Sequence, residues 1–214
     1  MRIEINISKI DLICYILTYH LYGGSVEVRS ESSQLYRIKE DFRIFWKKRP
    51  GNFLKLLYFP DIRTVVIFRL SQFFFNIGLK PIAYLLTNLN DLLHGIWIGP
   101  RVEVGEGFSL GHPRGLVVSP ATKIGRYVTI INQVTLGGPS VVIEDFVEIG
   151  AGVQIISTQT RPVTVGAHSI IGAGSVLVHS VPPFSVVVGV PARVVKLKNL
   201  SSWLEEHPYY IDNV

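Results

Sequence analysis

The sequence predicts a mainly β fold, a parallel β-helix of six-residue repeats preceded by an α-helical region. Two observations predict it. In the second half of the chain aliphatic residues recur every six positions, whereas in the first half apolar residues recur at helical spacing. The change falls near Gly95, where short words of Val, Ile, Gly and Ala replace long side chains. We therefore expect a mostly helical region at 1–95, a β-helix at 96–195 and a C-terminal extension at 196–214.

The composition indicates the cellular compartment but does not identify a binding partner. The 214 residues are 48% hydrophobic and 17% charged, enough to bury a core, and a net charge of +5 selects no partner by itself. The single cysteine, Cys14, has apolar neighbours and predicts an unreactive buried thiol in a reducing, cytoplasmic compartment. The apolar stretch 10–22 is interrupted by Asp11 and His20 and is shorter than the roughly 20 residues that span a bilayer. We expect neither a transmembrane helix nor a signal peptide.

Two helices are expected before the β-helix. Asp61 can cap the start of the first and Gly78 can end it, and Pro81 suits the first turn of a second helix that continues toward Leu93. One apolar face is expected on the first helix, formed by Ile62, Val66, Leu70, Phe73, Phe74 and Ile77.

The six-residue period identifies the β-helix, and its interruptions identify loops. The repeating aliphatic positions are Ile98, Val104, Leu110, Val118, Ile124, Ile130, Leu136, Ile143, Ile149, Ile155, Val165, Ile171 and Leu177. Leu110 to Val118 spans eight residues, so the coil that carries residues 111–115 must bulge outward. Ile155 to Val165 spans ten, which makes 157–161 a small loop. Loops on a rigid scaffold often carry sites; for 157–161 a tolerated insertion is the preferred interpretation.

Three stretches resemble the serine acetyltransferase-like branch of the hexapeptide-repeat acyltransferases. They are LGHPRGLVV at 110–118, IINQVTLGG at 130–138 and IGAGSVLVHSVPPFSVVVGVPARVV at 171–195, and the segment 68–93 is similar to the last helices before the β-helix in that branch. The resemblance implies a left-handed β-helix, although crossovers between parallel strands are usually right-handed. It also implies homotrimers with acetyl-coenzyme A sites between subunits, and we expect that trimers can pair through their N-terminal helices.

The chemistry implied is O-acetyl transfer, with His112 as the catalytic base. The reaction needs a base for the hydroxyl proton, and histidine suits this because its ordinary pKa is near 6.5. His112 lies in the bulged coil and matches the family's catalytic histidine. His168 needs only a solvent-facing role and His94 can interact with the last carbonyls of its helix, while His20 and His207 lie outside the similar region. If His112 is structural, His94 and His179 are the next candidates for the base.

Small residues are expected to line the coenzyme. By resemblance, Ala151 and Ala173 lie along the pantetheine arm, Val178 and His179 make the next contact pair, and Arg193 meets a coenzyme phosphate. The alternative for each is a tight corner of the backbone. No histidine or carboxylate pair has ligand spacing, so no metal is expected.

Three departures from the family affect the acceptor. Trp97 stands where the family has the aspartate that orients the histidine, Gly111 replaces a second aspartate, and 137–139 run directly into 142–144 without the family's arginine-histidine loop. We therefore expect the acceptor to be a hydroxyl of a sugar, a polysaccharide precursor or a specialised metabolite, and free serine to be a poor acceptor; the alternative is serine acetylation in cysteine biosynthesis. A backbone carbonyl, Asp91 or Glu103 would then orient His112.

Two other classes of function stay open. The first is a non-catalytic trimeric scaffold, which would have little reason to keep a histidine in a bulged coil. The second is contact with a membrane surface through basic and aromatic residues, although helix packing explains the same residues and is preferred. They are Arg43, Trp46, Lys47, Lys48, Arg49, Phe53, Leu54, Leu56 and Leu57. Binding to nucleic acid is not expected, since no recognition motif accompanies the charge.

Overall fold

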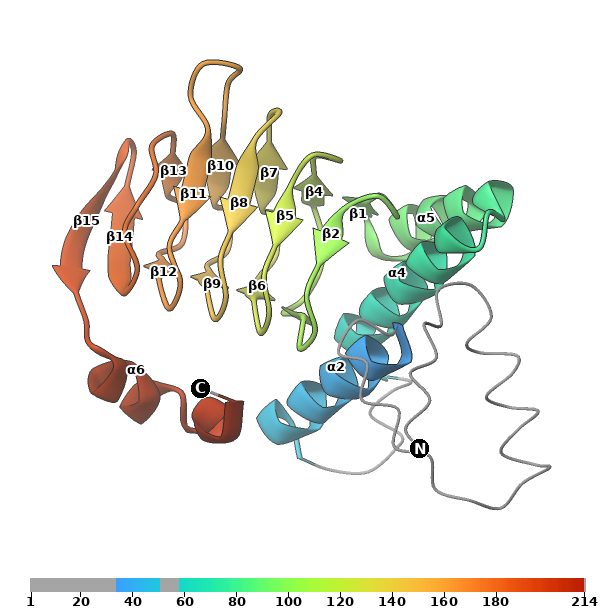
Figure 1. Cartoon of the computed structure of the whole chain (residues 1–214), viewed down its shortest axis with the longest axis horizontal. Coiled ribbons are helices and arrows are strands. Elements are labelled where there is room, and N and C mark those ends of the chain that lie inside the picture. The colour runs from blue at the N-terminus through green and yellow to red at the C-terminus, as the bar shows by residue number, and fades with distance from the viewer. Residues whose placement is uncertain (1–33, 51–57, 214) are drawn as a thin grey trace, which may run out of the picture.

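The computed structural model describes residues 34–50 and 58–213, in which helices precede strands (Figure 1). Helix α2 spans Gln34–Lys48, α4 spans Pro60–Asn76 and α5 spans Lys80–His94. The strands are β1 Ile96–Ile98, β2 Glu103–Val104, β3 Ser109–Leu110, β4 Leu116–Val118, β5 Lys123–Ile124, β6 Thr129–Ile130, β7 Thr135–Gly137, β8 Val141–Ile143, β9 Glu148–Ile149, β10 Gln154–Ile156, β11 Val163–Val165, β12 Ile170–Ile171, β13 Val176–Leu177, β14 Ser185–Gly189 and β15 Ala192–Leu197. Helix α6, Leu200–Glu206, and the 3-10 helix η1, Pro208–Asn213, follow them. The expectations for 10–22, Cys14, His20 and 53–57 lie outside the described residues.

The strands wrap into a left-handed β-helix of about five turns. Every third strand stacks in register, which gives three sheets with the orders β1-β4-β7-β10-β13, β11-β8-β5-β2 and β15-β14-β12-β9-β6-β3. Neighbouring strands pair in parallel up to β14, and β15 then folds back antiparallel on β14. The predicted fold class, a mainly β left-handed parallel β-helix after a helical region, is confirmed. No helix in the described part of the chain has the length and apolarity to cross a membrane.

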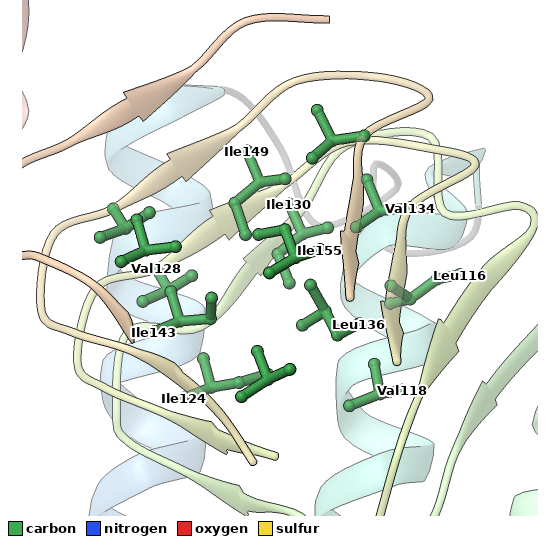
Figure 2. Close-up of a cluster of buried hydrophobic side chains, with 14 of the residues drawn as sticks. Leu116, Val118, Ile124, Val128, Ile130, Val134, Leu136, Ile143, Ile149 and Ile155 are labelled. Carbon is green, nitrogen blue, oxygen red and sulfur yellow. The ribbon is translucent and has the colours of Figure 1, made fainter. Parts of the chain in front are cut away.

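Aliphatic side chains from successive coils stack along the axis and fill the β-helix (Figure 2). Ile124 lies beside Ile143, and Leu136 beside Ile155, so residues that recur in the sequence become neighbours in the core. Each is at most 4% exposed, and burial of apolar area contributes about 25 cal/mol per Å². The six-residue period in the sequence therefore identifies the residues that form the core.

The first coil is longer than the second, as the spacing predicts. Leu110 pairs with Ile130 and Val118 pairs with Leu136, so the first coil carries two extra residues between these partners. They lie in the turn 111–115, between β3 and β4. The loop after β10 is closed by a bridge between Thr158 and Arg161.

The helices cover the open end of the β-helix and satisfy its backbone. Arg69 of α4 is fully buried, donates to the Val104 carbonyl at 2.9 Å and pairs with Asp41 of α2. Gln72 donates to the Val102 carbonyl at 2.8 Å, and Asp41 accepts from the Phe108 amide at 2.8 Å. A sheet edge with unpaired backbone groups invites association with another chain. These side chains occupy that edge.

This capping corrects the expected face of the first helix. The predicted residues are only partly buried apart from Ile62, while Val65, Phe68, Arg69 and Gln72 face the β-helix. A pattern of apolar residues at helical spacing cannot predict a buried face that includes polar side chains. The buried face of α4 includes polar side chains because the backbone carbonyls at the open end of the β-helix need hydrogen-bond donors.

The C-terminal segment packs on a stack of rings at another corner of the β-helix, between the β2-β5-β8-β11 sheet and the β3-β6-β9-β12 sheet. Tyr127, Phe146, His168 and Phe184 stack from coil to coil, with centroids 4.7–5.0 Å apart. Trp203 of α6 meets Phe146 and His168 edge-on and is fully buried. We call this stack the aromatic corner. The expectation that His168 faces solvent is wrong, because its ring lies between two phenyl rings and under an indole.

Three basic residues of α2 form ion pairs or hydrogen bonds, two with the C-terminal segment or the β-helix and one within α2 itself. Lys47 pairs with Asp212, Lys48 donates to Thr129 and lies over the Tyr209 and Tyr210 rings, and Arg43 pairs with Glu40. The described contacts favour packing over a membrane role for this segment, and the packing lies within the chain.

Candidate active site

Three of the predicted site residues share one corner of the β-helix. This corner joins the sheet of β3, β6, β9 and β12 to the sheet of β4, β7, β10 and β13. It consists of residues 111–115, 131–134, 150–153 and 172–175, one segment from each coil, and we call it the His112 corner. His112, Ala151 and Ala173 all lie on it. The stacking of coils thus places residues 61 positions apart at one corner.

Backbone hydrogen bonds stack the segments of this corner into a continuous column. The Gln133 amide donates to the Arg114 carbonyl at 2.6 Å, the Gly152 amide to the Asn132 carbonyl at 3.0 Å, and the Gly174 amide to the Ala151 carbonyl at 2.8 Å. The coil directly below His112 carries Asn132 and Gln133, and the next two coils carry small side chains, with Ala151 half-buried and Ala173 exposed. An open track therefore runs from His112 toward the C-terminal coils.

His112 is held by its backbone and presents its side chain to solvent. Its φ is +51°, a left-handed conformation that costs a non-glycine residue roughly 1 kcal/mol or more. Its amide donates to Asp61 Oδ1 at 3.0 Å, and Asp61 Oδ2 pairs with Arg49 Nη1 at 2.7 Å. Asp61 is 2% exposed, so this link is shielded from water. The expected role of Asp61 as the cap of α4 is wrong: Phe59 precedes the helix, and the Asp61 carboxylate turns to the β-helix.

The residues considered as orienting groups for the imidazole are elsewhere. Glu103 pairs with Lys123 at 3.3 Å on the face formed by β2 and β5. Asp91 is exposed on α5, and its carbonyl accepts from Gly95. None of the hydrogen bonds formed among the described residues reaches an imidazole nitrogen of His112. Asp61 positions the backbone, and neither carboxylate holds the ring.

A pocket of about 260 Å³ opens beside His112 on the side of the helices. Its walls are Pro60, His94, His112, Pro113, Arg114 and Asn132. Asn132 comes from the coil directly below His112, and His94 comes from the end of α5. The pocket therefore joins the helical region to the bulged turn, and it supplies a base, an amide and a guanidinium.

His94 is a buried, neutral wall of this pocket. Burial lowers the pKa of its imidazole, and the positive charges of Arg63 and Arg114 lower it further. Its Nδ1 lies 2.9 Å from Asn90 Oδ1. Because an amide oxygen only accepts, Nδ1 carries the proton and Nε2 keeps a lone pair. The expectation that His94 bonds the last helix carbonyls is wrong, since its partner is a side chain one turn earlier.

The remaining predicted contacts lie further along the β-helix. Val178 and His179 follow β13, one corner beyond the Ala173 turn, and His179 is exposed. Arg193 is exposed on β15, where its Nη1 donates to the Ala192 carbonyl at 2.9 Å. The structure brings none of the three to the His112 pocket. Their place at the far end fits the length of coenzyme A, and their contacts stay a prediction.

A larger groove, of about 900 Å³, holds none of the predicted site residues. It runs over β2, β5 and β8 beside α2 and α4, and both charges line it, among them Arg37, Lys123, Glu144 and Asp145. No described group of three or more histidine, cysteine or acidic residues could hold a metal, here or elsewhere. The smaller pocket is the candidate active site because it contains the histidine and the open column.

One of the departures from the family has a steric basis. Gly111 is buried, and a Cβ there would lie 2.9 Å from Ile131 Cδ1, so an aspartate would require that side chain to move. Gly138 has φ of +99°, and a Cβ on it would collide with the Ser157 carbonyl. Trp97 lies in β1 beside Val117 and is 46% exposed. Of the three departures, the described contacts thus explain the glycine at 111.

Sequence reasoning missed Asp61, Asn132 and Arg114 as parts of this site. Asp61 is 51 residues from His112, and only folding brings them together. Asn132 and Arg114 lie inside two of the motifs that carry the family resemblance, but the resemblance assigns roles to neighbouring residues and none to these two. Their position one coil apart on the same corner was available from the period of six.

Comparison with known proteins agrees with this architecture. Serine acetyltransferase of Synechococcus elongatus is 33% identical over 165 residues, which cover 72% of this chain and 66% of that protein. Serine acetyltransferase of Bacillus subtilis is 32% identical over 168 residues, 74% of this chain and 76% of that protein. The crystal structure of the Brucella abortus serine acetyltransferase in complex with coenzyme A superposes with a TM-score of 0.68 at 30% identity, covering 77% of this chain and 68% of that one. No family model matches the chain.

A histidine at a corner of a left-handed β-helix, above a column of small residues, defines a hexapeptide-repeat acyltransferase. Within that class, the chain belongs to the serine acetyltransferase family. It spans from 52% to 76% of the length of curated relatives that it matches.

These relatives correct the expected acceptor. The expectation of a sugar, polysaccharide precursor or specialised metabolite is wrong, because the relatives and solved structures that match are serine acetyltransferases. The expectation rested on three missing groups, at 97, at 111 and after 138. Such absences do not by themselves identify a different acceptor.

Proposed function

We propose that this protein transfers the acetyl group of acetyl-coenzyme A to the hydroxyl of L-serine. The observation that carries the proposal is the His112 corner: an exposed imidazole on a fixed backbone, with a pocket on one side and an open column of small residues on the other. Membership of the serine acetyltransferase family supports serine as the acceptor. The alternative of a non-catalytic scaffold would leave this arrangement without a purpose.

The column provides the path for the coenzyme. Its pantetheine arm would lie along Ala151 and Ala173, where no large side chain interrupts the track. The phosphates would lie toward the far end, near His179 and Arg193. The thioester then ends beside His112, and the serine hydroxyl approaches from the pocket. Holding the two reactants together removes much of the entropic barrier.

His112 would act as the general base. Its imidazole accepts the hydroxyl proton as the serine oxygen attacks the thioester carbon, which forms a tetrahedral oxyanion. The Asn132 amide lies in the same pocket and can donate a hydrogen bond to that oxyanion. Collapse of the intermediate breaks the C–S bond, and the imidazolium returns its proton to the coenzyme thiolate. The products are O-acetylserine and free coenzyme A.

Assembly into trimers completes the proposal. Helix α5 presents a row of exposed apolar side chains that continues onto β1 and β4, and a monomer rarely leaves so much apolar surface open. The row contains Leu79, Ile82, Tyr84, Leu85, Leu89, Leu92, Leu93, Trp97 and Val117. Sedimentation equilibrium should give three times the mass of the chain, or six times if trimers pair. A stable monomer at micromolar concentration would contradict this part.

The reaction itself is tested with the purified full-length protein, acetyl-coenzyme A and L-serine. Release of free thiol, together with O-acetylserine identified by mass spectrometry, is the expected result. D-serine and buffer without acceptor serve as controls. If thiol release with serine does not exceed release without acceptor, across pH 6–9, the proposed function is wrong.

A further inference from the structure

The pocket beside His112 carries positive charge without a matching acid. Arg114 lines it and Arg63 lies near, since both charges act on His94. Both side chains are exposed, and no ion pair formed within the described residues involves either guanidinium. The nearest buried acid, Asp61, already accepts from the His112 amide and pairs with Arg49. The pocket is therefore prepared for an anion that the chain itself does not supply.

The position of this charge selects the acceptor rather than the coenzyme. The track of small residues leads from His112 through Ala151 to Ala173, away from the helices. Arg114 lies at the end of this column nearest the helices, where it lines the same pocket as Pro60 and His94. A coenzyme that follows the track reaches His112 with its acetyl end, while its phosphates stay several coils away. The anion beside Arg114 must then belong to the acceptor.

We propose that Arg114, assisted by Arg63, binds the carboxylate of the acceptor and so replaces the arginine-histidine loop that this chain lacks after 138. The proposal rests on the proposed function and names the specificity residue of the same site. A guanidinium can form two parallel hydrogen bonds to one carboxylate, and these are stronger than hydrogen bonds between neutral groups. Arg114 follows His112 by two residues, so a carboxylate held there keeps the attached hydroxyl within reach of the imidazole.

The backbone of Arg114 explains why this side chain is free to bind. Its amide donates to the His112 carbonyl at 2.8 Å, and its carbonyl accepts from the Gln133 amide at 2.6 Å. The backbone thus closes the bulged turn and rests on the next coil. Replacing the side chain removes none of these bonds, so a variant at 114 should fold as the parent does.

The test compares L-serine with L-serinamide, which keeps the hydroxyl and amine but lacks the carboxylate. For the unaltered protein, kcat/KM should be far lower with serinamide. Arg114→Gln should raise the KM for serine by about 10- to 100-fold, as expected for the loss of a charged hydrogen-bonded pair. It should leave the KM for acetyl-coenzyme A and the activity with serinamide nearly unchanged. Arg63→Gln should act in the same direction with a smaller effect.

The matched control is Arg101→Gln, because Arg101 is an exposed arginine that lines the other groove. It should leave both acceptors unaffected. If Arg114→Gln keeps the KM for serine within twofold, or raises the KM for acetyl-coenzyme A instead, Arg114 does not bind the acceptor carboxylate, although serine acetylation still stands. If the unaltered protein acetylates neither acceptor, the proposed function fails first.

Discussion

Two corners of the same β-helix use the same backbone and opposite side chains. At the His112 corner, positive φ angles fall at His112, Gly115, Gln133, Gly152 and Gly174; at the aromatic corner they fall at Tyr127, Phe146, His168 and Phe184. Their values lie between +51° and +71°, so the chain turns in the same way at both places. The first corner stays open, while rings fill the second.

This difference separates the requirements of the fold from those of the site. A left-handed turn costs a non-glycine residue about 1–2 kcal/mol, and glycine avoids this cost. At the aromatic corner, stacked rings and the indole of Trp203 offset the cost by burying large apolar area. At the His112 corner, two of the three turns below the histidine use glycine, and these glycines are half-buried at 152 and exposed at 174. An open column is what a long ligand needs.

The largest expected effect comes from removing the base at the open corner. His112→Asn keeps the size and polarity of the side chain but cannot accept a proton at neutral pH. We expect kcat with serine to fall roughly 10²–10⁴-fold, the usual contribution of a general base, with the KM for acetyl-coenzyme A little changed. Steady-state kinetics with both substrates measures this. A near-normal kcat would make His112 structural and direct the search to His94.

At the aromatic corner, the largest effect should be on stability rather than on chemistry. Trp203→Ala removes a fully buried indole from the ring stack and should lower the free energy of unfolding by roughly 3–5 kcal/mol. The kcat of the folded protein should stay near normal, because Trp203 contacts none of the pocket residues. Urea unfolding followed by circular dichroism tests this. Leu200→Ala, at a residue 39% exposed in the same helix, is the control. Equal losses of stability for the two variants would show that Trp203 does not hold α6 on the aromatic corner.

Filling the open corner should impair the coenzyme selectively. Ala173→Phe puts a ring on the track where the aromatic corner already has one, and we expect the KM for acetyl-coenzyme A to rise roughly 10- to 100-fold. Stability should change little, because residue 173 is exposed. Thr160→Phe, in the exposed loop after β10, provides the same ring off the track. If both variants bind the coenzyme as the parent does, the ligand follows another path.

The smallest effect concerns pH at the aromatic corner. His207 Nε2 pairs with Glu148 at 3.2 Å, and its Nδ1 lies 2.7 Å from the Trp203 carbonyl. Burial would lower the pKa of His207, but the bond to Glu148 outweighs it and raises the pKa above the ordinary 6.5. The same bond holds the pKa of Glu148 below 4.5 against burial, which would raise it.

The sign of the pH effect follows from these directions. Because the pKa of His207 is raised in the folded protein, this group stabilises the fold fully below pH 6.5. The contribution is lost as the pH rises through the pKa of His207 in the folded protein. Because the pKa of Glu148 is lowered in the folded protein, this group stabilises the fold fully above pH 4.5. The contribution is lost as the pH falls through the pKa of Glu148 in the folded protein. Hydrogen exchange in α6 should therefore be slowest between about pH 4.5 and 6.5, after correction for intrinsic rates. His207→Gln should flatten this profile; an unchanged profile would show that the pair does not hold the segment.

Much of the fold followed from the sequence alone. A period of six has one structural solution, a coil of three short strands, so the aliphatic residues that recur in the chain had to stack in the core. The same period placed Ala151 and Ala173 at one corner with His112, and the interval of eight predicted the bulged turn. The family resemblance likewise followed from contiguous words. All of these features are local or periodic, so they can be predicted from the order and spacing of residues alone.

The tertiary structure decided everything that depends on the helices meeting the first coil. Asp61 holds the His112 backbone from 51 residues away, and Arg69 lies buried because open strands need donors. The position of Arg114 beside His94 became visible only in the folded pocket, and His168 is not solvent-facing because α6 packs over its ring. Periodicity specifies contacts between coils of one solenoid, whereas contacts between unlike elements depend on docking that no repeat encodes.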